Sequence, residues 1–377
     1  MARPFSFLIR VIPIAGSIAG MAAWYCAIRL CAPLGAGSWW RPAIGLGMAL
    51  IWAFPLLRIL GMGRIEQLGL WNLGFYLLGL AATFLICMFG LDAVGLGMRV
   101  FGLALPLQAP WAMAGASFLM SLWGLKTAFS IPGIVSISIP HKDLHPDLVG
   151  LRIVQISDVH ISSMLGQGYV KRVVDTVMAQ NPDLIAITGD LVDGPLDELK
   201  DAVGPLALLR AKWGVFYVTG NHEYIWGAKD WIKKLKTLGL EVLDNAHKEL
   251  KIGAATLLVI GINDLSAQRM GSMDRPDVQA AIHDAPRADF KLFLAHQPQA
   301  WREAAVAKAD LMLAGHTHAG QFFPFQRIVS LFHRYFKGLY RHEDEFWVYI
   351  NSGSGFWGPP NRLWVPTEIT VLELKKR

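Results

Sequence analysis

Apolar and polar positions divide the chain into two parts with different patterns. The first 130 residues contain four long, charge-free apolar stretches, at 11–28, 42–57, 67–91 and 100–125. A helix needs roughly 20 apolar residues to cross a bilayer. Tryptophan and tyrosine residues lie largely towards the stretch ends, as an aromatic belt at the membrane surface would require. The pattern predicts an all-α region of four transmembrane helices over 1–130, the fourth beginning near Pro110.

Two other interpretations of these stretches explain less of the chain. A cleaved signal peptide accounts only for the first stretch, and a soluble helical core would be overfilled by four. Three spans with one interfacial stretch remain an alternative. Basic residues favour a cytoplasmic position for the second part of the chain, at a bacterial-type inner membrane. Six lie on its side of the predicted spans and three on the other: Arg3, Arg10, Arg58, Arg64, Lys126 and Lys142 against Arg29, Arg41 and Arg99.

From residue 131 onward the apolar runs are shorter and alternate with helical patterns. Strand patterns at 151–156, 183–188 and 214–218 are separated by helical patterns at 168–180 and 197–211. Strand, helix and strand in alternation are typical of a mostly parallel sheet. Residues 131–150 resemble a linker and a first edge strand. Further strand patterns follow with fewer helices, at 257–260, 291–294, 311–313, 346–350 and 369–372. Residues 131–377 therefore predict an α/β domain with two mixed sheets sandwiched between helices.

Charge separates the same two parts. Residues 1–130 contain eight basic and two acidic residues, whereas residues 131–377 contain 27 of each sign. The net charge of +6 therefore belongs to the apolar part, where basic residues flank the stretches and form no patch. We expect no nucleic-acid binding on that ground. All three cysteines lie in the apolar part, which is consistent with a reducing compartment.

Five short polar motifs follow strand patterns in the second part. They supply carboxylate, imidazole and amide groups, the ligand set that suits divalent metals such as Mn, Zn or Fe. Ligands at strand ends are held by a rigid sheet and stay open to substrate. A single motif of this kind is weak evidence, but five in a fixed order are specific. The motifs are Ser157-Asp158-Val159-His160, Gly189-Asp190-Leu191-Val192-Asp193, Gly220-Asn221-His222-Glu223, Ala295-His296-Gln297-Pro298 and Gly315-His316-Thr317-His318.

These motifs resemble those of the calcineurin-like metallophosphoesterase superfamily, over roughly residues 150–360, and the apolar leader resembles its membrane-bound bacterial branch. The resemblance implies a dinuclear site for two divalent ions, with Mn first and Zn, Fe or Mg as alternatives. Asp190 would bridge both ions, which a carboxylate can do across about 3.5–4 Å. By motif, the remaining ligands would be Asp158, His160 and His318 for one ion and Asn221, His296 and His316 for the other.

The same resemblance assigns roles beside the metals. A water between two cations becomes a nucleophile near neutral pH. His222 would stabilise developing charge or protonate the leaving oxygen, and Asp193 would orient an imidazole. Arg362 is either a phosphate clamp or a surface residue. Glu223, where many members have aspartate, and Ala319, where glycine is common, depart from the family pattern without removing a ligand. Six further histidines match no motif: His141, His145, His247, His283, His333 and His342.

The sequence favours a membrane-anchored phosphohydrolase. Aromatic and basic residues alternate over 322–341, which is typical either of a segment in the lipid headgroup region or of a core-packing loop. The first alternative predicts a phosphodiester or pyrophosphate substrate in a membrane lipid. Some members of the bacterial branch are similar to pyrophosphatases of UDP-2,3-diacylglucosamine, which makes that lipid the expected substrate. A soluble phosphoester and a catalytically silent scaffold are the alternatives. Protein partners and oligomeric state stay open.

Overall fold

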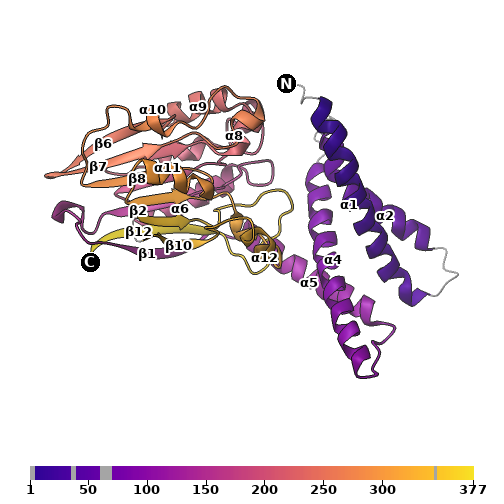
Figure 1. Cartoon of the computed structure of the whole chain (residues 1–377). Helices are drawn as coiled ribbons and strands as arrows, with labels where there is room; N and C mark the ends of the chain where they lie inside the picture. Colours follow the sequence, from indigo (N-terminus) through magenta and orange to yellow (C-terminus); the bar gives the residue numbers. More distant parts are fainter. Residues whose placement is uncertain (1–4, 35–39, 60–69, 344–345) are drawn as a thin grey trace. The chain divides into compact units, whose positions relative to one another are not determined.

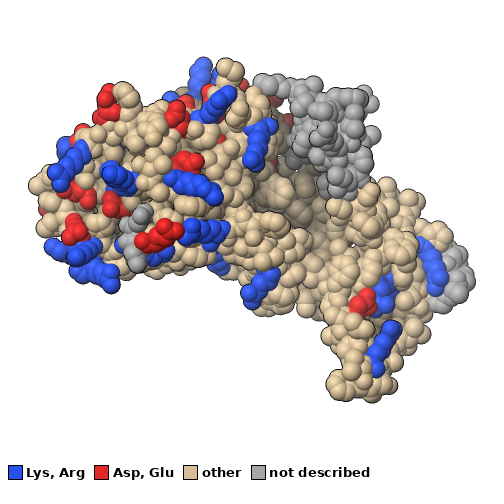
Figure 2. Space-filling view, in the orientation of Figure 1, with Lys and Arg blue, Asp and Glu red and all other residues tan. Residues whose placement is uncertain are grey.

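The computed structural model describes the backbone of residues 5–34, 40–59, 70–343 and 346–377, with side chains except at 5–15 and 55–59. The chain separates into two compact units (Figure 1). Residues 1–126 and 358–361 form a helical unit. Residues 127–357 and 362–377 form an α/β unit. Charged side chains of both signs are interspersed over the face of the α/β unit seen in Figure 2, whereas the surface of the helical unit is mostly uncharged.

The helical unit contains a long helix at each of the four predicted stretches. The fourth begins beside Pro110, where the sequence predicts it. Within the described residues only Gly16–Leu34 and Leu70–Val100 are long and apolar enough to cross a membrane, while Trp40–Phe54 is apolar but shorter. The structure therefore supports two candidate membrane helices, and the other two predicted spans stay predictions. The helices are α1 (Phe5–Cys31), α2 (Trp40–Ile59), α4 (Leu70–Val100) and α5 (Ala109–Phe129).

Helix α4 is longer at its C-terminal end than its charge-free stretch, which ends at residue 91. The helix continues to Val100 and so includes Asp92. Asp92 is paired with Arg29 of α1 at 2.6 Å and accepts a hydrogen bond from Tyr25. Because both charges are neutralised by this contact, an acidic residue is tolerated inside an apolar helix. The pair also fixes α1 against α4.

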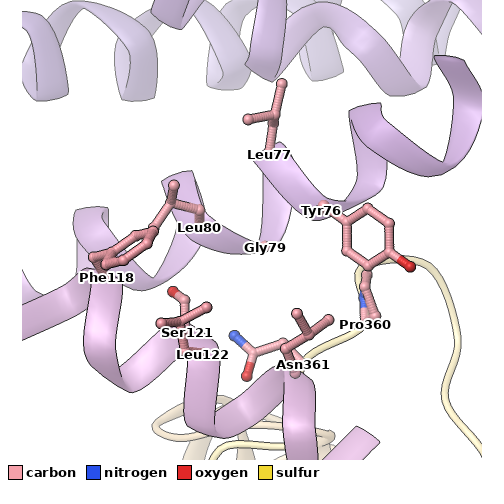
Figure 3. Close-up of a pocket in the computed structure, with 10 residues that line it drawn as sticks. Tyr76, Leu77, Gly79, Leu80, Phe118, Ser121, Leu122, Pro360 and Asn361 are labelled. Atoms are coloured by element: carbon pink, nitrogen blue, oxygen red, sulfur yellow. The ribbon is translucent and has the colours of Figure 1, made fainter. Parts of the chain in front are cut away.

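Residues 358–361 pack within the helical unit although their neighbours in sequence belong to the other one. Asn361 donates from Nδ2 to Oγ1 of Thr83 in α4 at 2.9 Å. An apolar pocket of about 160 Å³ lies here, between α4, α5 and Pro360 (Figure 3). The buried Asn361 thus anchors a short, proline-containing segment of the C-terminal region on the long helix α4.

The α/β unit is built on two six-stranded mixed sheets. In the first, β2, β3, β4 and β5 are parallel, and the C-terminal strand β12 lies antiparallel to β2 and parallel to β1. In chain order its strands are β1 (Gly133–His141), β2 (Arg152–Ile156), β3 (Leu184–Thr188), β4 (Val215–Val218), β5 (Glu241–Val242) and β12 (Glu368–Lys376). Strand β1 stands at the edge of this sheet, as the sequence predicts for residues 131–150.

The second sheet has a parallel centre and antiparallel edges. Strands β7, β8, β9 and β11 are parallel, whereas β6 and β10 pair antiparallel at either edge. The sequence predicts neither edge strand, because each of them buries only one side chain and therefore shows no apolar run. The strands are β6 (Ala246–Ile252), β7 (Ala255–Gly261), β8 (Phe290–Leu294), β9 (Leu311–Ala314), β10 (Gly338–His342) and β11 (Phe346–Ile350).

Apolar side chains of the two sheets form a common core, and helices cover the outer faces. Ile153, Phe216 and Leu257, with Leu313, are fully buried in that core. Valines of α6 pack outside the first sheet, and alanines of α11 outside the second. The helices are α6 (Gln167–Met178), α7 (Leu196–Leu199), α8 (Asn221–Ile225), α9 (Ala228–Thr237), α10 (Val278–Ile282), α11 (Trp301–Val306) and α12 (Phe325–Ser330). The predicted fold of two mixed sheets with flanking helices is confirmed for this unit.

Candidate metal centre

All five motifs stand at the carboxyl ends of parallel strands. Asp158 and His160 follow β2, Asp190 follows β3, and Asn221 opens α8 directly after β4. In the second sheet, one histidine follows β8 and two follow β9. Because the carboxyl ends of neighbouring parallel strands lie along one edge, side chains distant in sequence meet there. The ligands therefore come from both sheets of the sandwich.

The ligand residues have unusual backbone conformations. Asp158, His160, Asp190, His316 and His318 all have a positive φ, between 49° and 70°. A residue with a side chain rarely adopts this left-handed conformation, which costs of order 1–3 kcal/mol and clusters at functional sites. Five of the seven predicted ligands thus carry backbone strain that turns their side chains out of the strand direction and towards one centre.

Two motif glycines permit this convergence. A Cβ at Gly315 would collide with the side chains of Ser157 and Asp158, and one at Gly220 would collide with Asp190. Each glycine lets the end of one strand approach a carboxylate on another. The glycines of the third and fifth motifs therefore have a steric role, independent of any ligand.

The first group of ligands is Asp158, His160 and His318. Nε2 of His160 lies 3.0 Å from Nε2 of His318, and His318 Nε2 lies 3.4 Å from Oδ1 of Asp158. All three side chains are buried. Three ligand atoms within this radius surround a space suited to one cation, and the group is the one predicted for the first metal.

The second group is Asp190, His296 and His316. Oδ2 of Asp190 lies 3.1 Å from Nε2 of His296, which in turn lies 3.1 Å from Nδ1 of His316. The same Oδ2 lies 3.8 Å from Nε2 of His160 in the first group. Asp190 therefore faces both groups, as a bridging carboxylate must.

Asn221 provides an independent test of whether a metal fits here. Its Oδ1 is buried and has no hydrogen-bond partner among the described residues. A buried amide oxygen without a partner costs free energy, and a cation would satisfy it. Its neighbour His222 donates its backbone N–H to Asp190 at 2.8 Å, which places the residue beside the second group. The donor set, its burial and this oxygen fit two divalent ions.

Surrounding groups fix the orientation of the ligands. Nδ1 of His296 lies 2.8 Å from the carbonyl oxygen of Thr188, so Nε2 is left for a metal. Asp158 accepts from the hydroxyl of Ser157 at 2.5 Å and from the backbone N–H of His316 at 3.1 and 3.0 Å. These contacts hold the ligands in place before any ion binds.

His222 and Asp193 form a pair beside the ligands. Nδ1 of His222 lies 3.1 Å from Oδ1 of Asp193, which also accepts from Nε1 of Trp226 at 2.9 Å. Nε2 of His222 lies 4.0 Å from Oδ2 of Asp190. The structure thus brings the two predicted catalytic residues together, with the ring of His222 at the metal ligands and Asp193 behind it.

Burial and charge set the protonation of the imidazoles. Burial, with help from neighbouring imidazoles, lowers the pKa of His160 and of His316 to about 3. Both rings are therefore neutral, which is the form that binds a metal. Burial also acts to lower the pKa of His222, but Asp190 and Asp193 outweigh it and raise that pKa to about 9.

Arg362 is placed differently from either predicted role. It is fully buried and donates from Nε to the carbonyl oxygen of Gly355 at 3.0 Å and from Nη1 to those of His318 and Ser352 at 3.0 and 2.8 Å. Its Nη2 lies 2.8 Å from Nδ1 of His318. Neither a surface residue nor a phosphate clamp is placed in this way. Arg362 supports the loops beneath a metal ligand.

Glu223 has a larger role than the sequence suggests. Its carboxylate accepts backbone N–H groups of Asp190, Leu191, Val192 and Gly220, at 3.1, 2.7, 3.3 and 2.6 Å. It therefore ties the second motif to the third. The sequence shows only that glutamate replaces aspartate at this motif position, and it gives no signal of these four contacts.

Asp264 is a functional-site neighbour that no motif identifies. It is buried just after β7 and accepts from Nε2 of Gln297 at 2.9 and 3.0 Å. Gln297 follows His296 directly, so Asp264 helps to hold the fourth motif. A polar residue within a few positions of the end of a buried parallel strand is the signal that could have identified it.

Comparison with known proteins agrees with this site. The family model described as calcineurin-like phosphoesterase matches residues 151–320. A transmembrane protein with metallophosphoesterase domain from Danio rerio is 34% identical over 264 residues, covering 68% of this chain and 60% of that protein. An uncharacterized metallophosphoesterase from Helicobacter pylori is 37% identical over 225 residues, covering 59% and 60%. The chain thus spans about 60% of the length of these two relatives.

A third relative is matched over most of its length. An uncharacterized metallophosphoesterase from Campylobacter jejuni is 30% identical over 278 residues, covering 74% of this chain and 72% of that protein. Among solved structures, a dimetal phosphatase from Danio rerio is 12% identical with a TM-score of 0.36, covering 55% of this chain and 88% of that one. A score this low carries no argument about function. The family model, the relatives and the dinuclear ligand set agree: the chain belongs to the calcineurin-like metallophosphoesterases.

Proposed function

We propose that this chain is a metal-dependent phosphoesterase that hydrolyses a phosphodiester or pyrophosphate bond in a membrane lipid, with UDP-2,3-diacylglucosamine as the first substrate to test. One observation carries the proposal: a complete dinuclear ligand set lies in the same chain as two helices long and apolar enough to cross a membrane. An enzyme held at a bilayer meets lipid phosphoesters at high effective concentration, because they share its surface.

The ligand residues divide into two metal positions. Asp158, His160 and His318 would hold one ion, and Asn221, His296 and His316 the other, with Asp190 between them. Two bound divalent ions supply positive charge for the phosphate oxygens and lower the pKa of water. We propose Mn as the physiological ion, with Zn, Fe and Mg as the alternatives to measure against it.

His222 would act on the leaving group. Asp193 fixes its Nδ1 edge at 3.1 Å, so its Nε2 edge is directed towards the carboxylate of Asp190 and the reaction space. A protonated imidazole in this position stabilises charge on the phosphoryl oxygens and donates a proton to the departing oxygen. Diester and pyrophosphate bonds both have a leaving oxygen that benefits from such a proton.

The proposed location is a bacterial-type inner membrane, with the α/β unit on the cytoplasmic side. The excess of basic residues flanking that side of the apolar stretches supports it. Of these residues, Arg3 and Arg64 lie outside the described residues. We propose no nucleic-acid binding, because the basic residues of the first part flank apolar stretches and form no patch.

The experiment is hydrolysis of UDP-2,3-diacylglucosamine by the purified full chain in mixed micelles with Mn. We expect Asp190→Ala and His222→Ala to abolish turnover. The matched control is His283→Ala, at an exposed histidine, which should leave turnover unchanged. His222 is not one of the predicted metal ligands, so His222→Ala should retain metal. It should nevertheless lose activity, because general acid catalysis contributes typically 10²–10⁴-fold.

A soluble phosphoester is the competing substrate class. A nucleotide phosphodiester is assayed in parallel under the same conditions. Activity on that soluble diester equal to or above the activity on the lipid would reject the lipid proposal and leave the phosphoesterase class intact.

A further inference from the structure

The segment that follows the last metal motif exposes large apolar side chains. Leu331 is 81% exposed and Phe332 is 76% exposed, far above what a core-packing loop allows. A soluble surface rarely collects several such residues unless it binds something. The exposed residues of this aromatic face are Phe323, Phe325, Ile328, Leu331, Phe332 and Trp364.

These side chains belong to one anchored surface. The ring of Phe323 lies 5.2 Å from that of Trp364, and its N–H donates to the carbonyl oxygen of Leu363 at 3.1 Å. Tyr335, later in the same segment, is buried against Trp301, and its hydroxyl lies 2.5 Å from Nδ1 of His342. The segment is thus packed into the fold by its inner residues while its outer residues face away. Its inner side packs as the predicted core-packing loop would, and its outer side has the exposed residues that a segment in the lipid headgroup region would need.

The segment also carries charge of one sign. Residues 321–342 include no aspartate or glutamate. Basic side chains beside exposed aromatic ones can rest their apolar stems on a membrane surface and direct their charges to anionic headgroups. The basic residues are Arg327, Lys337 and Arg341, together with Arg334, which is paired with Glu343 at 2.9 Å.

The segment that carries the aromatic face also contacts residues of the metal centre. Thr317, between two metal ligands, donates from Oγ1 to the carbonyl oxygen of Phe336 at 2.8 Å. The ring of His333 lies 6.1 Å from that of the ligand His316. Whatever the face binds is therefore held close to the edge of the site.

We propose that the aromatic face docks the α/β unit onto the headgroup region of an anionic bilayer, so that the metal centre opens towards lipid phosphates. The face has features of an interfacial site: exposed aromatic and aliphatic side chains with basic neighbours, and no acidic residue within 321–342. A bilayer is favoured over a second protein because the same chain carries two helices suited to a membrane, which keep that surface within reach. The inference concerns where the unit binds and stands apart from the identity of the substrate.

Photo-crosslinking of the full chain tests the contact directly. The photoreactive p-benzoyl-phenylalanine replaces Phe332 in one variant and Val306 in a control. Val306 is 50% exposed at the end of α11, on the approach to the amino end of β9, opposite the ligand edge. In nanodiscs containing phosphatidylglycerol we expect a lipid adduct at position 332 at least tenfold above that at 306. Equal adducts at both positions, or a protein adduct at 332, would overturn the proposal.

Activity provides the second readout. We expect Leu331→Asp with Phe332→Asp to lower turnover of a phosphoester lipid in vesicles by about tenfold or more, while turnover of a soluble aryl phosphodiester stays unchanged. Val306→Asp should alter neither. Equal loss with the soluble substrate would show damage to the site and contradict docking. If the wild-type chain cleaves no lipid, the substrate proposal fails while the crosslinking result still decides the docking face.

Discussion

Glu223 organises the backbone of the site without touching a metal position. Its two oxygens accept four backbone N–H groups from the second and third motifs. Burial raises the pKa of its carboxyl to about 7, while the N–H groups of Gly220 and Leu191 act in the opposite direction. An amide cannot replace it well, because its NH₂ group would face N–H donors. The motif pattern predicts the ligands, since their chemistry is specific, but not this support, which depends on backbone geometry alone.

Glu223→Gln should therefore weaken metal binding with the ligands intact. Loss of a residue that orients metal ligands typically lowers affinity 10–100-fold, and we expect a decrease in that range. Titration of the metal-free chain with Mn by calorimetry measures it, with exposed Glu249→Gln as the control. Wild-type affinity in Glu223→Gln would show that the four N–H contacts do not position the ligands.

Arg362→Met tests whether the buried guanidinium supports the fold. The substitution leaves the carbonyl oxygens of Gly355, His318 and Ser352 without their donor. Each unsatisfied buried group costs about 1–3 kcal/mol, so the melting temperature should fall in metal-free protein as well. Exposed Arg287→Met is the control. An unchanged melting temperature with a tenfold rise in KM would instead restore the phosphate-clamp interpretation.

At the scale of elements, prediction from sequence succeeds where burial is complete and fails where it is partial. Strands β3 and β4 are buried along their whole length, and β2 is buried after its first residue, so their apolar runs identify them. The helix predicted over 197–211 is only α7 with a short 3-10 helix, Gly204–Leu208, which has proline at its start. Proline at residue 205 has no N–H to continue an α-helix. Strand β6 escapes prediction because most of its side chains are not buried.

Strand β12 joins the last residues of the chain to the centre of the first sheet. Leu372 pairs with Ile137 of β1 on one side and with Ile153 of β2 on the other. A proline there removes a ladder N–H between two strands, which a strand paired on both sides does not tolerate. We expect Leu372→Pro to yield aggregated protein, as measured by size-exclusion chromatography in detergent. Lys376→Pro, at the last residue of the strand, should remain soluble; aggregation of both would assign the effect to the terminus in general.

For the molecule as a whole, the metal centre joins two sheets that otherwise meet through apolar packing. Asp158, His160 and Asp190 extend from the first sheet, and His296, His316 and His318 from the second. Ions held by both sets would oppose their separation. The cross-sheet contact is already close without them, because Nε2 of His318 lies 3.0 Å from Nε2 of His160 and 3.4 Å from Oδ1 of Asp158. The sequence predicts that such a centre exists, but the pairing of strands from two sheets around it is a property of the tertiary fold.

Metal removal should therefore destabilise the α/β unit. Ligand binding at 100 times Kd stabilises a protein by about 2.7 kcal/mol, which for a domain of this size shifts the melting temperature by roughly 5–10 °C. We expect a chelator to lower the main unfolding transition by about this amount, and Mn to restore it, in wild type and in His283→Ala. Asp190→Ala should show no response to either, because the carboxylate that faces both groups is lost. A wild-type transition that is the same with and without metal, in protein shown to bind Mn, would mean that the centre binds its ions without joining the sheets.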